Sequence, residues 1–228
     1  MIKKSSCRFP TKDTLFVCTL SLIVALANSV GFFLALLQKP ADTVYLGTIH
    51  YWEDYFFYLN HFFQGAHGAW LTVNRFTTEM THPTIIYWSN VLLGKLGSFF
   101  TMSPITSYNM SVIVLSFLVL VSSYILLKTR FFPLRPKHAV IAFFFASLAT
   151  SLINYVKSND GPMIFWPFQI WRSPHFAFDR LGGAPHQLMQ TLLFYWTLYF
   201  LFAPKNIPKK NGVQDLHTQA PLAIIPGI

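Results

Sequence analysis

The chain has 228 residues, of which 53% are hydrophobic and only 11% are charged. Soluble domains carry about 25% charged side chains. This composition therefore excludes a disordered chain, a coiled coil and an ordinary water-soluble enzyme, and it indicates a protein whose solvent is largely lipid. The net charge is +9, but no Lys- and Arg-rich run carries interleaved aromatic residues in a polar setting, so we expect no nucleic-acid partner.

The N-terminal residues 1–13 are basic, and residues 14–37 contain no charged side chain. A membrane-spanning helix needs about 20 apolar residues, whereas the apolar core of a signal peptide has about 7–15. We therefore interpret residues 14–37 as an uncleaved transmembrane helix and the residues before it as a cytoplasmic N-terminus.

Three further uncharged runs predict transmembrane helices at residues 105–127, 139–156 and 184–203. Residues 84–102 are also apolar, but Lys95 interrupts them, and a charged side chain at the centre of a spanning helix is costly. We predict that this segment is short or re-entrant and returns to the side from which it came. The expected fold is therefore an all-α, multi-span helical bundle in a membrane.

The distribution of basic residues supports this topology, because Lys and Arg are enriched in cytoplasmic loops. Without a crossing at 84–102, the cytoplasmic segments are the N-terminus, a basic turn at 128–138 and a tail at 204–228. Together they hold 11 of the 17 Lys and Arg residues. Residues 38–104 and 157–183 then form two outer loops. We expect an integral membrane protein whose N-terminus is cytoplasmic.

The first outer loop is rich in aromatic residues and predicts an interfacial helix. Trp52, Phe56, Leu59 and Phe63 recur at helical spacing and form an apolar stripe. Such a helix lies at the membrane surface, with Trp and Tyr at headgroup depth and its carboxylates facing water or a cavity.

Two adjacent acids on this predicted helix, Glu53 and Asp54, are the candidates for chemistry. A carboxylate placed against Trp and Tyr just beyond a membrane span can take a proton from an attacking hydroxyl or amine. The alternative is that both acids are solvated surface residues of an interfacial helix.

The second outer loop mixes charged residues with Trp and Phe and contains three prolines, which disfavour a stable helix. Arg172 and Arg180 are candidates for binding a lipid phosphate or diphosphate, because the planar guanidinium binds two oxygens. The alternative is that both arginines anchor the loop to anionic headgroups.

Histidines of the outer loops are candidate metal ligands. His175 and His186, with His61 or His67 and an acid, could form a site, but the sequence has no close pair such as His-x-x-x-His. A divalent metal is therefore an option that no motif supports. The sequence also lacks a P-loop and a dinucleotide fingerprint, and we predict no other cofactor.

Four features in order resemble the N-terminal part of the GT-C-type integral membrane glycosyltransferases, the superfamily of the protein mannosyltransferases and the lipid A aminoarabinose transferases. They are the basic N-terminus with one span, the acid pair Glu53-Asp54 with the loop residues after it, His82-Pro83 opening an apolar segment, and the basic turn Lys128–Lys137 before another span and a second outer loop. The loop residues concerned are Tyr55, Tyr58, Gln64-Gly65, Gly68, Trp70, Asn74-Arg75, Thr77 and Glu79. The resemblance covers most of the chain and depends on this order rather than on one motif.

The resemblance implies a transferase of the bacterial inner (plasma) membrane. Such an enzyme moves a sugar, with inversion, from a polyprenyl-phosphate donor to an acceptor glycan, lipid or protein on the outer face of that membrane. It implies that Asp54 is the catalytic base, with Glu53 as the second candidate, and that Arg172 and Arg180 hold the donor phosphate. The residues expected to bind the acceptor or the sugar are Tyr58, His61, Gln64, Trp70, Glu79, Asp160, Asp179 and His186.

The sequence departs from the pattern of this superfamily in two ways. Its first loop carries Glu53-Asp54 and no Asp-x-Asp, which weakens a metal-dependent, oligosaccharyltransferase-like interpretation. Members of the superfamily also have more spans, so we expect these 228 residues to be a fragment of a larger protein. The alternative function is a non-catalytic multi-span membrane protein or a transporter subunit.

Overall fold

The computed structural model describes residues 11–47, 52–131, 135–148, 153–157, 163–167 and 184–202. These residues are mainly helical, as the sequence predicts, with one pair of strands. The helices are α1 (Thr11–Asn28), α2 (Val30–Gln38), α3 (Trp52–Ala66), α4 (Trp88–Phe99), α5 (Pro104–Leu126), the π-helical turn η1 (Leu127–Phe131), α6 (Pro136–Leu148) and α8 (Pro185–Leu201), and the strands are β1 (Ile153–Lys157) and β2 (Met163–Pro167).

Within the described residues, one helix is long and apolar enough to cross a membrane by itself, the continuous run Pro104–Phe131 of α5 and η1. The helices α1 and α2 reach that length only as a pair, and the chain bends by 49° between them. The 13 residues of α6 and the 17 residues of α8 are fewer than the about 20 that a span needs. The predicted multi-span bundle is therefore not confirmed.

The prediction of a helix through residues 139–156 is wrong at its C-terminal end. The helix α6 ends at Leu148, and residues 153–157 form β1, which pairs antiparallel with β2. The two strands are rich in β-branched and aromatic residues, which favour an extended backbone. In this pairing Ile153 lies opposite Pro167, and Lys157 lies opposite Met163.

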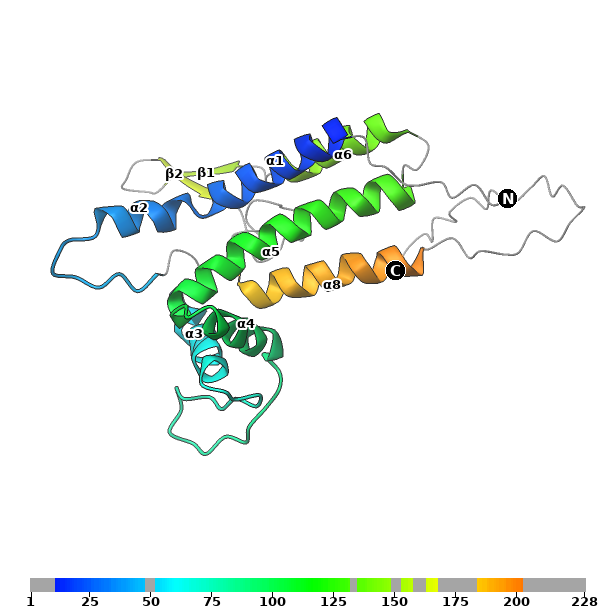
Figure 1. Ribbon diagram of the computed structural model, residues 1–228. Coiled ribbons are helices and arrows are strands. Elements are labelled where there is room, and N and C mark those ends of the chain that lie inside the picture. Colours follow the sequence, from blue (N-terminus) through cyan, green and yellow to red (C-terminus); the bar gives the residue numbers. More distant parts are fainter. Residues whose placement is uncertain are drawn as a thin grey trace, which may run out of the picture.

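The helices α1, α5, α6 and α8 lie side by side and form a bundle, and α3 and α4 pack across one end of it (Figure 1). At this end, the Ser107 hydroxyl of α5 donates a hydrogen bond to the Leu93 carbonyl of α4, over 3.0 Å. At the far end, the Arg130 Nε donates to the Tyr199 carbonyl of α8, also over 3.0 Å. The helices α5 and α8 therefore run in the same direction, and both begin beside the α3–α4 pair.

The two ends of this bundle differ in charge. The η1 turn and the starts of α1 and α6 lie at the end away from α3 and α4 (Figure 1) and carry the basic residues Lys12, Lys128, Arg130, Arg135 and Lys137. The turn predicted at 128–138 thus lies with the N-terminal end of α1, as the charge pattern requires.

The outward surface of the bundle is apolar. Large hydrophobic side chains are exposed on all four of its helices: Leu15, Ile23, Val114, Leu118, Ile141, Phe145, Phe194, Phe200 and Leu201. Exposed apolar patches of this extent on a protein mark an interaction surface, and a hydrocarbon environment is one that would cover them.

The helices α3 and α4 cross at two glycines. A Cβ atom at Gly65 would collide with the backbone of Val91, and a Cβ atom at Gly94 would collide with the backbone of Phe62. The same pair of helices is fixed on α5 by aromatic stacking, because the Tyr108 ring lies 5.0 Å from the Tyr55 ring and 5.3 Å from the Phe62 ring. This close packing fixes the position of α3 on the bundle.

The packing face of α3 is not the apolar stripe that the sequence predicts. Tyr55 and Phe62 are 1% and 0% exposed, whereas Phe56 and Phe63 of the predicted stripe are exposed. The aromatic residues of α3 therefore divide between two faces, one against the protein and one available to the membrane surface.

The side chain of Gln64 fixes the loop between α3 and α4. Its Nε2 donates to the Val73 carbonyl over 2.9 Å, and its Oε1 accepts from the Val73 amide over 3.1 Å. Thr72 and Thr84 then pair through two backbone hydrogen bonds of 2.9 Å and close the loop on itself.

We expect Gln64→Leu to destabilise this loop by about 1–3 kcal/mol, because the Val73 amide loses its hydrogen-bond acceptor. Limited proteolysis should then cut within residues 71–86 faster than in the parent protein. Gln38→Leu at the exposed end of α2 is the matched control, and equal cutting rates in the two variants would contradict the assigned role of Gln64.

Candidate functional site

Asp54 lies in the first turn of α3, at the end of the bundle opposite the basic residues. Its side chain is exposed, and the Tyr58 hydroxyl donates to its Oδ2 over 3.5 Å. Glu53 lies beside it in α3, but its side chain is outside the described part. The carboxylate of Asp54 is thus accessible from solvent and is oriented from one side by a phenol.

Two histidines from distant parts of the sequence meet next to Asp54. The His186 ring lies 4.6 Å from the Tyr58 ring and 5.6 Å from the Tyr87 ring, while the Tyr87 ring lies 4.5 Å from the His61 ring. Asp54 joins these rings through the hydrogen bond that the Tyr58 hydroxyl donates to it. Five side chains form a continuous cluster, which we call the His–Tyr cluster: Asp54, Tyr58, His61, Tyr87 and His186.

His61 is the most buried member of the His–Tyr cluster, with 3% of its surface exposed. Its ring packs at 4.8 Å against Phe57, and its Nδ1 lies 2.8 Å from the Phe57 carbonyl. A carbonyl only accepts, so Nδ1 carries the proton in this contact, and Nε2 is left as the acceptor. Burial lowers the pKa of His61 below its usual value, although the hydrogen bond to Phe57 opposes that shift.

A cavity of about 300 Å³ opens beside the His–Tyr cluster, between the starts of α4 and α8. Polar side chains make up much of its wall, which includes Tyr87, Ser89, His186, Gln187 and Gln190. The Nδ1 atom of His186 is buried and has no hydrogen-bond partner among the described residues. The cavity can therefore accept a polar ligand within reach of the acid.

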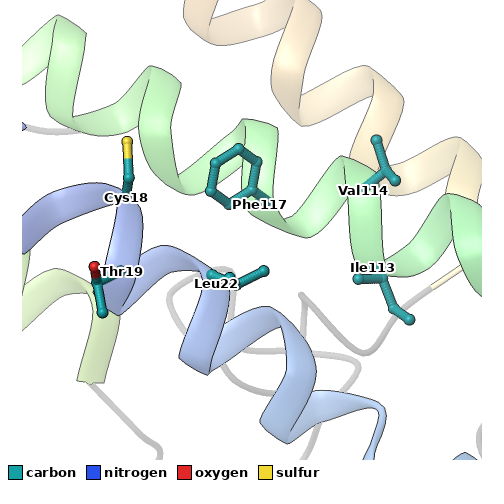
Figure 2. Close-up of a pocket in the computed structure, with 6 residues that line it drawn as sticks. All are labelled: Cys18, Thr19, Leu22, Ile113, Val114 and Phe117. Atoms are coloured by element: carbon teal, nitrogen blue, oxygen red, sulfur yellow. The ribbon is translucent and has the colours of Figure 1, made fainter. Parts of the chain in front are cut away.

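A second, apolar cavity of about 340 Å³ lies within the bundle, between α1 and α5. Figure 2 shows Cys18, Thr19 and Leu22 of α1 facing Ile113 and Phe117 of α5 across it. Its wall offers hydrocarbon contacts and few polar ones, so it has no chemistry of its own.

The other candidate residues do not join the His–Tyr cluster. Gln64 is occupied with Val73, as described above. Trp70 is 60% exposed, and its ring lies 4.5 Å below the Lys95 ammonium group. Glu79 is exposed in the loop after it. Four candidates from the second outer loop lie outside the described residues: Asp160, Arg172, Asp179 and Arg180.

Several cavity residues were missed at the sequence level. Tyr87, Ser89, Gln187 and Gln190 carry no charge and belong to no motif. The available signal in the sequence is the polar pair Ser89-Asn90 inside the apolar segment 84–102. In the structure this pair lies in the first turn of α4, where Ser89 lines the cavity.

No group of three or more His, Cys, Asp and Glu side chains in the described part of the chain is arranged to hold a metal ion. His61, His186 and Asp54 are near one another, but His61 uses Nδ1 on a backbone carbonyl.

Acidification should destabilise the protein through His61. The folded protein holds this ring neutral, whereas in the unfolded chain it titrates near 6.5. The stabilisation that is present above the unfolded pKa is therefore lost as the pH falls toward the lowered folded pKa. We expect melting temperature to decrease from about pH 7.5 to about pH 5, and to decrease less in His61→Phe. The exposed His82→Phe should behave like the parent, and identical pH profiles for all three proteins would contradict the assignment.

Comparisons of this chain with protein-family models, with curated proteins and with solved structures give no match.

Proposed function

We propose that the protein is an integral membrane glycosyltransferase that moves a sugar from a polyprenyl-phosphate donor to an acceptor on the outer face of the membrane. The observation that carries this proposal is the position of Asp54. An accessible carboxylate, hydrogen-bonded to Tyr58, lies near a polar cavity at the end of the bundle opposite the basic residues of η1, α1 and α6.

The distribution of surface residues supports a place in the bilayer. The exposed apolar side chains of α1, α5, α6 and α8 favour contact with lipid tails, and the basic end favours the cytoplasmic side. In a bacterial inner membrane this orientation leaves the N-terminus in the cytoplasm and the α3–α4 pair at the outer surface. The 12 residues of α4 are too few for a crossing, which supports a segment that returns to its own side.

In the proposed reaction Asp54 is the general base. The acceptor hydroxyl gives its proton to the Asp54 carboxylate while its oxygen attacks the anomeric carbon of the donor sugar. The bond between that carbon and the phosphate oxygen breaks, polyprenyl phosphate leaves with the electron pair, and the anomeric configuration inverts. The hydroxyl of Tyr58 holds the carboxylate in place, since it donates to Oδ2.

The aromatic side chains around the site have two roles in this scheme. The rings of Tyr58, Tyr87 and Phe57 offer faces against which the CH groups of a sugar pack. They also exclude water that would otherwise hydrolyse the donor. The long apolar tail of the donor stays in the bilayer along the exposed hydrophobic side chains of the bundle.

The proposal is tested with the protein in proteoliposomes that contain a polyprenyl-phosphate-linked radiolabelled sugar. We expect protein-dependent formation of polyprenyl phosphate and transfer of the label to an added membrane extract. A donor pool that stays intact with every sugar offered would contradict the proposal and favour a non-catalytic membrane protein.

A further inference from the structure

Two helices begin at the polar cavity. Trp88 starts α4 and Pro185 starts α8, and residues of both first turns line the cavity. The capping residues Tyr87 and Ala184 make no side-chain hydrogen bond to the helix that follows. The first N–H groups of a helix have no partner within it, and together with the helix dipole they make its N-terminus attractive to an anion. Pro185 has no N–H, and the amides of Trp88 and Gln187 already donate to the carbonyls of Ile85 and Ala184 over 2.9 Å and 3.0 Å. The amides of Ser89 in α4 and His186 in α8 are the first-turn donors next to the cavity.

Buried polar side chains at the same place are without partners. Ser89 lines the cavity and is 5% exposed, and its hydroxyl makes no hydrogen bond with another described residue. The Nδ1 atom of His186 is likewise buried and unpaired. Asn90 follows Ser89 in the chain and is 0% exposed with an unpaired amide, but it does not line the cavity. Buried polar atoms of folded proteins are nearly always paired, so the two lining residues Ser89 and His186 indicate a ligand that completes their pairing.

The hydrogen-bonding groups that line the cavity indicate which kind of ligand it binds. Hydroxyl, imidazole and amide groups can all donate hydrogen bonds, and no carboxylate belongs to the described residues that line the cavity. A tetrahedral oxyanion has acceptors on every side and matches both the side-chain donors and the two helix N-termini. The volume of about 300 Å³ holds a phosphate group with part of its substituent.

We propose that the cavity between α4 and α8 binds a phosphate group, with Ser89 and His186 as ligands. The phosphate is that of the polyprenyl-phosphate donor, in which case the assignment rests on the proposed function, or it is free phosphate. His186 then binds phosphate instead of the acceptor or sugar. The leaving phosphate also lies next to Tyr58 and Asp54, where the proposed reaction needs it.

The test measures equilibrium binding to the full chain in phosphatidylcholine nanodiscs. The probes are a polyprenyl phosphate, the corresponding polyprenol and inorganic phosphate. We expect Ser89→Ala and His186→Gln each to weaken binding of polyprenyl phosphate about tenfold, as the loss of one hydrogen bond to a charged group does, without affecting polyprenol. Ser98→Ala, an exposed change on the same helix α4, and His82→Gln should bind like the parent.

The outcomes separate the sources of the phosphate. If inorganic phosphate displaces bound polyprenyl phosphate at a comparable concentration, the cavity is a site for free phosphate. If only unlabelled polyprenyl phosphate displaces it, the cavity binds the lipid. Parent-like binding in both Ser89→Ala and His186→Gln would overturn the assignment, as would an equal loss of polyprenol binding. Because Ser89→Ala removes only one oxygen atom, it tests the site even where His186→Gln impairs folding.

Failure of this assignment is distinguishable from failure of the proposed function. Binding that depends on Ser89 without any sugar transfer would preserve the phosphate site and remove the transferase. Sugar transfer that depends on Asp54, together with phosphate binding that Ser89→Ala does not change, would preserve the transferase and remove the phosphate site.

Discussion

Asp54→Asn is expected to abolish sugar transfer while leaving the fold unchanged. The amide has the size and hydrogen-bonding geometry of the carboxylate but cannot take up the proton of the acceptor hydroxyl. General bases contribute about 10²- to 10⁴-fold to reaction rates, so transfer should fall by at least that lower factor. The side chain of Asp54 is exposed, and the Tyr58 hydroxyl can still donate to the amide oxygen.

The measurement is the initial rate of polyprenyl phosphate formation in proteoliposomes with equal amounts of folded protein. Glu53→Gln should only reduce the rate, because Glu53 is the second candidate for the base. Asp42→Asn is the control, since Asp42 is an exposed acid in the loop that follows α2. Near-parent rates in both Asp54→Asn and Glu53→Gln would remove the assignment of the base.

Binding of polyprenyl phosphate should survive in Asp54→Asn. The carboxylate does not line the cavity, although its charge acts on His186. A variant that binds the lipid but does not consume the donor separates chemistry from recognition, which an unfolded variant does not.

The long apolar segments and the charge pattern were accessible from the sequence. Residues 105–127 were predicted as a helix, and α5 with the first residue of η1 covers them. The basic residues of 128–138 were predicted to share an end with the start of the first helix, and they do so because α5 and α1 run in opposite directions (Figure 1). Both features depend on local composition, which a single sequence contains.

The strands of the second loop could not be predicted in the same way. Residues 139–156 form one uncharged run, and an uncharged run does not distinguish a helix from a helix followed by a short strand. The pairing of Ile153 with Pro167 depends on a partner strand later in the chain. The choice between the two structures is therefore made by tertiary contacts.

The candidate site was predictable in part of its residues but not in its arrangement. Asp54, Tyr58, His61 and His186 were all candidates, yet nothing in the sequence places His186 against Tyr58. That contact requires α8 to begin where α3 lies, which follows from the packing of α5 against both helices. Tyr87 connects the two histidines and is an uncharged aromatic residue among many in this chain.

Replacing the crossing glycines should have the largest effect on stability, because these residues fix the distance between α3 and α4. A methyl group at Gly65 meets the backbone of Val91, and a methyl group at Gly94 meets the backbone of Phe62. Backbone atoms cannot move aside as a flexible side chain can, so the helices must separate. We expect Gly65→Ala and Gly94→Ala each to cost about 1–3 kcal/mol of stability, the range found for overpacked cores.

Thermal melting in detergent micelles measures this loss, and Ser98→Ala provides the control on the exposed face of α4. The glycine variants should also bind polyprenyl phosphate more weakly, because α3 carries Tyr58 and His61 while the start of α4 carries Tyr87 and Ser89. A separation of the two helices moves these pairs apart even though neither glycine lines the cavity. Melting temperatures equal to that of Ser98→Ala would show that α3 and α4 do not pack through these residues, and the His–Tyr cluster would then lack the support on which its geometry depends.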